Sequence, residues 1–168
     1  MSAVSPRGLW IVTGLLLGLA IGALVPPLPL HAVATHSDEG FAICTAELFD
    51  GHEGIYFLDS RTGYLRALFL NPNNSKFTSF YEYKVLDDFN KPMSPKFLLV
   101  SGRSQLRATG NVKPSVGVVY VVETNSGIVN AYVAPYAPNH FSLNAPNTGT
   151  LIKLDTGKFV GQAVRPSK

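Results

Sequence analysis

The sequence has little cysteine, tryptophan or charge. Its 168 residues include one cysteine, Cys44, and one tryptophan, Trp10. A single cysteine excludes an intramolecular disulfide. The apolar neighbours of Cys44 predict a small buried hydrophobe rather than a reactive or ligating thiol. Charged residues make up 15% of the chain, below the usual quarter, and the shortage is concentrated at the N-terminus.

No Asp, Glu, Lys or Arg occurs in the thirty residues that follow Arg7. The apolar core of this stretch, Gly8–Val25, would be about 27 Å long as a helix, close to the bilayer core of about 30 Å. Arg7 before the core and acidic residues after it predict a cytoplasmic N-terminus and an exported remainder. Ala32-Val33-Ala34 has the small-x-small pattern of a signal peptidase site. Residues 1–34 are therefore expected to be a signal peptide cleaved after Ala34, or an uncleaved transmembrane anchor.

The rest of the chain is expected to form a linker (35–40), one all-β domain (41–163) and a tail (164–168). Apolar β-branched and aromatic runs alternate with Gly, Asn, Pro and Ser clusters, which is typical of strands joined by turns. The fold class is thus mainly β: an N-terminal apolar helix followed by an antiparallel β-meander, packed as a sandwich or partial barrel. Strands are expected at Phe41–Glu47, Gly54–Asp59, Tyr64–Leu70, Lys76–Val85, Lys96–Ser101, Val116–Glu123, Ile128–Ala134, Gly149–Leu154 and Lys158–Gln162.

The segment Phe77–Phe89 allows two interpretations. Apolar residues at every fourth position would line one face of a helix, whereas the residue types favour a strand. We expect a strand, on which the adjacent Asp87 and Asp88 would point to opposite sides and make a poor acid/base pair.

Two segments match when the sequence is compared with itself at an offset of 64 residues. Tyr56–Leu68 (YFLDSRTGYLRAL) aligns with Tyr120–Tyr132 (YVVETNSGIVNAY). Each has an apolar strand, an acidic residue, a polar turn ending in Gly and a second apolar strand, which predicts two related hairpins. Glu123 would then flank a turn, as Asp59 does, and Tyr120 would pair with Tyr132. A third, shorter version is Leu151–Gly161, with Asp155-Thr156-Gly157 as its turn.

The pattern V-Y-V-[DE]-x-x-[ST]-G-x-V-x-A-Y, carried by Val119–Tyr132 and more loosely by Ile55–Leu68, resembles the inner hairpin of β-propeller blades of the quinoprotein and YVTN type. The resemblance implies a structural repeat and transfers no quinone-binding residue. Two or three hairpins are too few to close a ring of at least four blades. The overall layout also resembles uncharacterised exported proteins of planctomycete-like bacteria, which implies no function.

The candidate metal ligands are Asp50, His52 and Glu53, which form the only compact polar cluster. One imidazole and two carboxylates could bind a cation. However, the cluster lacks the paired His or Cys of a zinc site and the alternating acids of a calcium loop, so a solvated turn is expected. Phosphate-binding glycine loops and nucleophile elbows are absent from the sequence. We therefore expect no cofactor and no enzymatic activity.

Charge differs between the two halves of the exported part. Thr35–Pro95 has nine acidic and five basic residues, whereas Lys96–Lys168 has two acidic and eight basic ones. The basic residues are too spread out to predict a nucleic-acid surface. They could contact anionic lipid or an envelope polymer, or the two halves could attract each other within one fold, which we favour. Binding would be sought in the long loops Ser101–Ser115 and Pro135–Thr150.

Together these features predict an exported, membrane-associated β-domain that acts as a structural or binding module of the cell envelope. Its partners would be the membrane, if the N-terminal segment is uncleaved, and a protein or envelope polymer. One alternative is a small metal-dependent or other enzyme built on Asp50, His52 and Glu53. Another is a subunit that completes the sheet or blade of a larger assembly.

Overall fold

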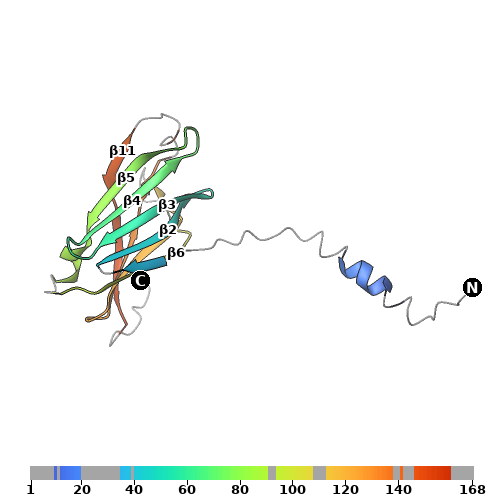
Figure 1. The fold of residues 1–168 in the computed structure, drawn as a ribbon, viewed down its shortest axis with the longest axis horizontal. Helices are drawn as coiled ribbons and strands as arrows, with labels where there is room; N and C mark the ends of the chain where they lie inside the picture. The colour runs from blue at the N-terminus through green and yellow to red at the C-terminus, as the bar shows by residue number, and fades with distance from the viewer. Residues whose placement is uncertain are drawn as a thin grey trace, which may run out of the picture. The chain divides into compact units, whose positions relative to one another are not determined.

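The computed structural model describes Trp10, 12–19, 35–38, 40–90, 94–107, 113–137, Phe141 and 146–159. The chain divides into two units, Met1–Ala32 and Val33–Lys168. In the first unit Trp10 and residues 12–19 are helical and exposed (Figure 1). None of the helices in the described residues has the length and apolar character needed to cross a membrane. The proposed cleavage site and much of Gly8–Val25 lie outside the described residues.

The second unit is mainly β, as predicted, and its larger sheet has six strands. Their order is β1-β2-β3-β4-β5-β11 (Figure 1). Neighbours are antiparallel except β11, which runs parallel to β5. Strand β1 lies in the segment expected to be a linker, 35–40, so residues 35–38 are part of the sheet. The bounds are β1 Thr35–Asp38, β2 Phe41–Phe49, β3 His52–Asp59, β4 Tyr64–Asn71, β5 Lys76–Lys84 and β11 Asn147–Thr150.

The smaller sheet has four antiparallel strands in the order β12-β9-β8-β6. Their bounds are β6 Phe97–Arg103, β8 Gly117–Glu123, β9 Ile128–Val133 and β12 Ile152–Lys158. A separate two-residue pairing joins β7 (Lys113–Pro114) to β10 (Pro135–Tyr136). Buried residues of both larger sheets belong to one hydrophobic core.

Two predictions for the C-terminal part were wrong. The parallel pairing of β11 with β5 departs from a purely antiparallel meander. Asp155-Thr156-Gly157 is not a hairpin turn, because these residues pair with β9 inside the continuous strand β12. The pairing of β12 with β9 shifts register between Lys153 and Asp155. Such a shift is typical of a β-bulge, where one strand contains an extra residue. The buried Leu151 separates β11 from β12, so a single stretch of chain passes from one sheet to the other.

Both interpretations of Phe77–Phe89 hold in part. Strand β5 ends at Lys84, and the 3-10 helix η1 covers Val85–Phe89. Val85 and Phe89 are buried, and η1 ends at Asn90 in the left-handed conformation. Of the apolar residues whose spacing suggested a helix, only Val85 and Phe89 lie in a helical turn. Asp87 and Asp88 lie on this turn rather than on a strand.

The hairpins β3–β4 and β8–β9 pair in the same register at the 64-residue offset. Tyr56 pairs with Ala67, and Tyr120 pairs with Ala131. The predicted pairing of Tyr120 with Tyr132 is therefore wrong by one residue. The reason is the four-residue turn, which joins Glu123 to Ile128 as the last pair. A shift by one residue moves a side chain to the opposite face of a sheet.

Ion pairs and backbone contacts join the two halves of the domain. Arg103 Nε lies 3.2 Å from Glu47 Oε2, and Lys153 Nζ lies 3.0 Å from Asp88 Oδ1. These pairs agree with the interpretation that the acidic and basic halves attract each other within one fold. The Val116 amide donates to the Leu48 carbonyl at 3.0 Å, which joins the end of β2 to the segment before β8.

Candidate binding surface

The acidic residues Asp59 and Glu123 stabilise equivalent turns. Asp59 Oδ1 accepts from the Arg61 amide at 2.9 Å, and Glu123 Oε2 accepts from the Ser126 amide at 2.8 Å. Burial raises the pKa of each carboxyl, but these turn hydrogen bonds outweigh it and leave both pKa values below their ordinary range. The predicted turn-flanking role of Glu123 is confirmed. Gly63 and Gly127 close the two turns with φ of 72° and 68°, as predicted.

The three candidate metal ligands surround the β2–β3 turn without converging. Asp50 has φ of 52° and is exposed, and Glu53 is exposed on β3. His52 Nδ1 lies 3.1 Å from the Phe49 carbonyl, and its ring stacks on Phe49 at 4.9 Å. Within the described residues no group of three or more His, Cys, Asp or Glu side chains could hold a metal ion.

The long loop after β10 is anchored by Phe141. Its buried ring lies 5.7 Å from both Phe49 and His52. Its carbonyl accepts from Asn71 Nδ2 at 3.3 Å and from Asn73 Nδ2 at 3.1 Å. Phe141, inside the predicted binding loop Pro135–Thr150, thus contributes to the core. Residues 108–112 of the other long loop lie outside the described residues.

A polar cluster that the sequence did not indicate joins η1 to the smaller sheet. Tyr132 Oη donates to Asp88 Oδ2 at 2.8 Å, and Lys153 occupies the other carboxylate oxygen. Burial, and then the hydrogen bond and charge of Asp88, raise the pKa of Tyr132. Both carboxylate oxygens of Asp88 thus have a partner on the smaller sheet. We infer that the cluster has a structural role, which is to hold η1 in place.

Cys44 is buried in the core, as predicted. Burial raises the pKa of its thiol to about 11, and the hydrogen bond with Ser101 opposes this only in part. The thiol therefore stays protonated and unreactive at neutral pH.

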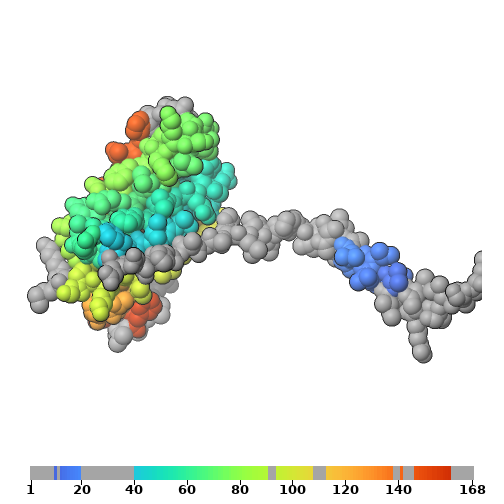
Figure 2. All heavy atoms as spheres, in the orientation of Figure 1, coloured from blue at the N-terminus to red at the C-terminus, as the bar shows by residue number. Residues whose placement is uncertain are grey.

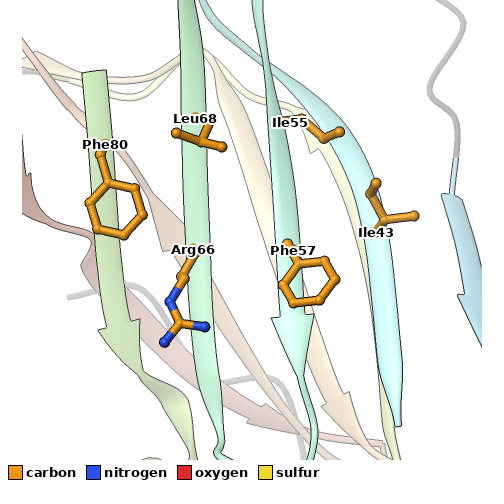
Figure 3. A pocket seen from close by; sticks show the side chains of 6 residues that line it. All are labelled: Ile43, Ile55, Phe57, Arg66, Leu68 and Phe80. Carbon is orange, nitrogen blue, oxygen red and sulfur yellow. The ribbon is translucent and has the colours of Figure 1, made fainter. Parts of the chain in front are cut away.

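The feature best suited to binding lies on the outer face of the six-stranded sheet, which Figure 2 shows as the surface formed by β2 to β5. Six side chains from these four strands surround a hollow of about 260 Å³ (Figure 3). We call it the apolar hollow; its lining consists of Ile43, Ile55, Phe57, Arg66, Leu68 and Phe80.

Register explains why these side chains meet. Leu68 of β4 pairs with Ile55 of β3 and with Phe80 of β5. In the neighbouring row, Phe57 pairs with Ile43 and with Arg66. Because every second residue of a strand points to the same face, the two rows lie side by side, as Figure 3 shows.

Arg66 is the charged member of the hollow. Its Nε lies 3.6 Å from Glu82 Oε2, and its guanidinium lies 5.1 Å from the Tyr64 ring centre. The remaining lining is apolar, and Phe57 and Leu68 are each 37% exposed. Small-molecule pockets usually enclose about 300–1,000 Å³, so the hollow better fits one large side chain of a partner.

Sequence reasoning missed this surface because it sought function in loops and polar motifs. The signal was present in β3 and β4, where the outward residues Ile55, Phe57 and Leu68 are apolar as well as the inward ones. Such continuous apolar runs are typical of strands covered on both faces.

Comparison with known proteins identifies no relative. No family description, curated protein or solved structure matches the chain.

Proposed function

We propose that the chain is an exported, membrane-associated β-domain that acts as a structural or binding module of the cell envelope. The observation that carries the binding role is the apolar hollow. Isolated surface hydrophobes are ordinary, but a contiguous apolar patch indicates an interaction site. Export and membrane association follow from the N-terminal sequence: the charge-free stretch, the single Arg7 before it and the small-x-small site after it.

The binding partner is proposed to be a protein. A shallow hollow crossing four strands offers a surface to another folded surface, with Phe57 and Leu68 as its exposed centre. Aromatic side chains are the residues that most often dominate such contacts.

The two hairpins are proposed to be repeats of one unit. Their common register and matching turn carboxylates support this proposal.

The test compares two leucines of equal exposure in the full chain. Leu68 is 37% exposed and lies in the hollow, whereas Leu106 is 38% exposed and lies outside it. After brief chemical cross-linking in intact membranes and mild extraction, native electrophoresis should show the unsubstituted chain in a species larger than one copy. Leu68→Ser should shift it to the single-copy position, and Leu106→Ser should not. A single-copy position for the unsubstituted chain, or equal behaviour of both variants, would contradict the binding role.

A second candidate is a subunit that completes another sheet. Among the described residues β12 pairs on one side only, with β9. It also exposes Ile152 and Leu154 by 40% and 41%. An unpaired edge can accept a further strand. Leu154→Pro, at the bulged position that is not paired with β9, would hinder such pairing without removing the Lys153–Asp88 ion pair. It should leave native mobility unchanged if the hollow, rather than this edge, holds the partner.

A further inference from the structure

The four-stranded sheet also has an apolar outer face. Leu98 and Val100 of β6 are 49% and 47% exposed. Leu98 pairs with Val122, and Val100 pairs with Tyr120. The row continues into β9, where Val129 and Ala131 are the partners of these two β8 residues and are half-buried. Both sides of the domain are therefore covered by apolar side chains.

The 64-residue offset exchanges the inner and outer faces of the two hairpins. Four side chains that each hairpin buries in the core align with outward side chains of the other, whereas Asp59 and Glu123, and Phe69 and Val133, are buried in both. The buried set Tyr56, Leu58, Leu65 and Ala67 aligns with the outward set Tyr120, Val122, Val129 and Ala131. The buried set Val119, Val121, Asn130 and Tyr132 aligns with the outward set Ile55, Phe57, Arg66 and Leu68.

Each outer face thus carries the kind of side chains that form the opposite wall of the core. The outward set of β8 and β9 matches the inner wall that β3 and β4 supply, with tyrosine and alanine retained and leucine replaced by valine. The outward set of β3 and β4 lines the hollow. In the 64-residue alignment it matches the buried residues of β8 and β9, which form the other wall of the core.

We propose that copies of this chain associate head to tail, the apolar hollow of one copy packing on the outer face of the four-stranded sheet of the next. This contact repeats between copies the sheet-on-sheet packing that forms the core within each copy, with sheets about 10 Å apart. The proposal rests on the proposed function, because it names a second copy as the protein that occupies the hollow. Because the two faces lie on opposite sides of the domain, repetition of this contact produces an open stack rather than a closed pair.

Charge favours this arrangement over a symmetric one. The ion pairs Glu47–Arg103 and Asp88–Lys153 use two charges from each half. The first half keeps an acidic excess and the second a basic excess after these pairs are set aside. Head-to-tail contact brings a half with net acidic charge beside a half with net basic charge, whereas contact between two like faces brings halves of like net charge together.

The expected strength of the contact between copies determines which assay can detect it. Four strands about 4.8 Å apart and about five residues long present roughly 300 Å² in projection. A standard interface buries about 800 Å² per partner. Each contact is therefore expected to be weak in dilute solution and to form where copies are concentrated in a membrane, so the test uses the full chain in membranes.

Cysteine cross-linking can report which faces meet, because Cys44 is the only cysteine. In a Cys44→Ala background, one tagged chain carries Leu68→Cys and a differently tagged chain carries Val122→Cys. Both are produced together and treated with a short bismaleimide. We expect a cross-linked dimer with both tags, at least tenfold above the mixture of Leu106→Cys with Val122→Cys. A chain with both Leu68→Cys and Val122→Cys should give a ladder of cross-linked copies.

Two results would overturn the proposal. A dimer from Leu68→Cys alone that exceeds the mixed dimer would show contact between two like faces. Absence of cross-linked species would show that copies do not associate through these faces. If native electrophoresis still shows a large species that depends on Leu68, the proposed binding function survives and only the identity of the partner is refuted.

Discussion

Gly117, the first residue of β8, lies against the backbone of β2. A Cβ atom at this position would be 2.5 Å from the Glu47 nitrogen and 2.6 Å from the Glu47 oxygen. Carbon contacts are most favourable at about 3.5–4.0 Å. Gly117→Ala therefore requires the two backbones to separate locally by about 1 Å.

The cost can be estimated from the kind of atoms that clash. Overpacking typically costs about 1–3 kcal/mol, and backbone atoms cannot rotate away as side-chain ends can. We expect a loss of about 3 kcal/mol in the free energy of unfolding, or about 12 °C in Tm at about 4 °C per kcal/mol. Gly102→Ala is the matched control, since a Cβ there would contact only Tyr120 Cε2, at 3.2 Å. Its effect should stay within about 0.5 kcal/mol.

Urea unfolding of the full chain, followed by far-ultraviolet circular dichroism in the same detergent, measures both variants. Equal midpoints for Gly117→Ala and Gly102→Ala would refute the close approach of β8 to β2, and with it the way the two sheets are joined.

Three further changes test the turn, the anchored loop and the buried thiol. The pKa of Glu123 is lower in the folded than in the unfolded state, so its carboxylate stabilises the fold above the unfolded pKa and loses this effect as the pH falls. Glu123→Gln should cost about 1–2 kcal/mol at pH 7, and urea titrations should show the gap closing at pH 3. Phe141→Ala should cost about 3 kcal/mol and speed limited proteolysis between Tyr136 and Asn147; unchanged proteolysis would refute the anchoring role. Cys44 should not react with a thiol reagent at pH 8 unless urea is added, because burial raises its pKa to about 11.

The predictions that succeeded rest on local physical chemistry. In both turns a carboxylate accepts hydrogen bonds from backbone amides two or three residues later, and a glycine closes the turn. These interactions are local, so the roles of Asp59 and Glu123 could be predicted from sequence. The existence of most strands followed from alternating or continuous apolar runs, and their ends were the least certain part.

The errors arose where distant parts of the chain decide the outcome. The parallel pairing of β11 with β5 joins residues 68 positions apart. A hydrogen bond from Asn147 Nδ2 to Tyr81 Oη, over 66 positions, supports the same pairing. The short helix η1 depends on burying Val85 and Phe89 beneath the sheets. The pairing of β11 leaves no local signal in the sequence, whereas the four-residue spacing of Val85 and Phe89 is a local signal for η1 that does not show where the helix begins.

The apolar hollow was overlooked for a different reason. Alternation indicates which face of a strand is buried only when the other face is polar. In β3 and β4 apolar residues lie on both faces, so the sequence could indicate strands without showing which side chains remain exposed.

The most direct test of the central claim is the accessibility of the hollow in intact membranes. Leu68→Cys and Leu106→Cys, each in a Cys44→Ala background, start from nearly equal exposure, 37% and 38%. Maleimide labelling rates are compared before and after a detergent separates the copies. We expect Leu68→Cys to label at least fivefold more slowly in the membrane, with Leu106→Cys unchanged. Equal rates for Leu68→Cys in both states would contradict the claim that this face binds a partner.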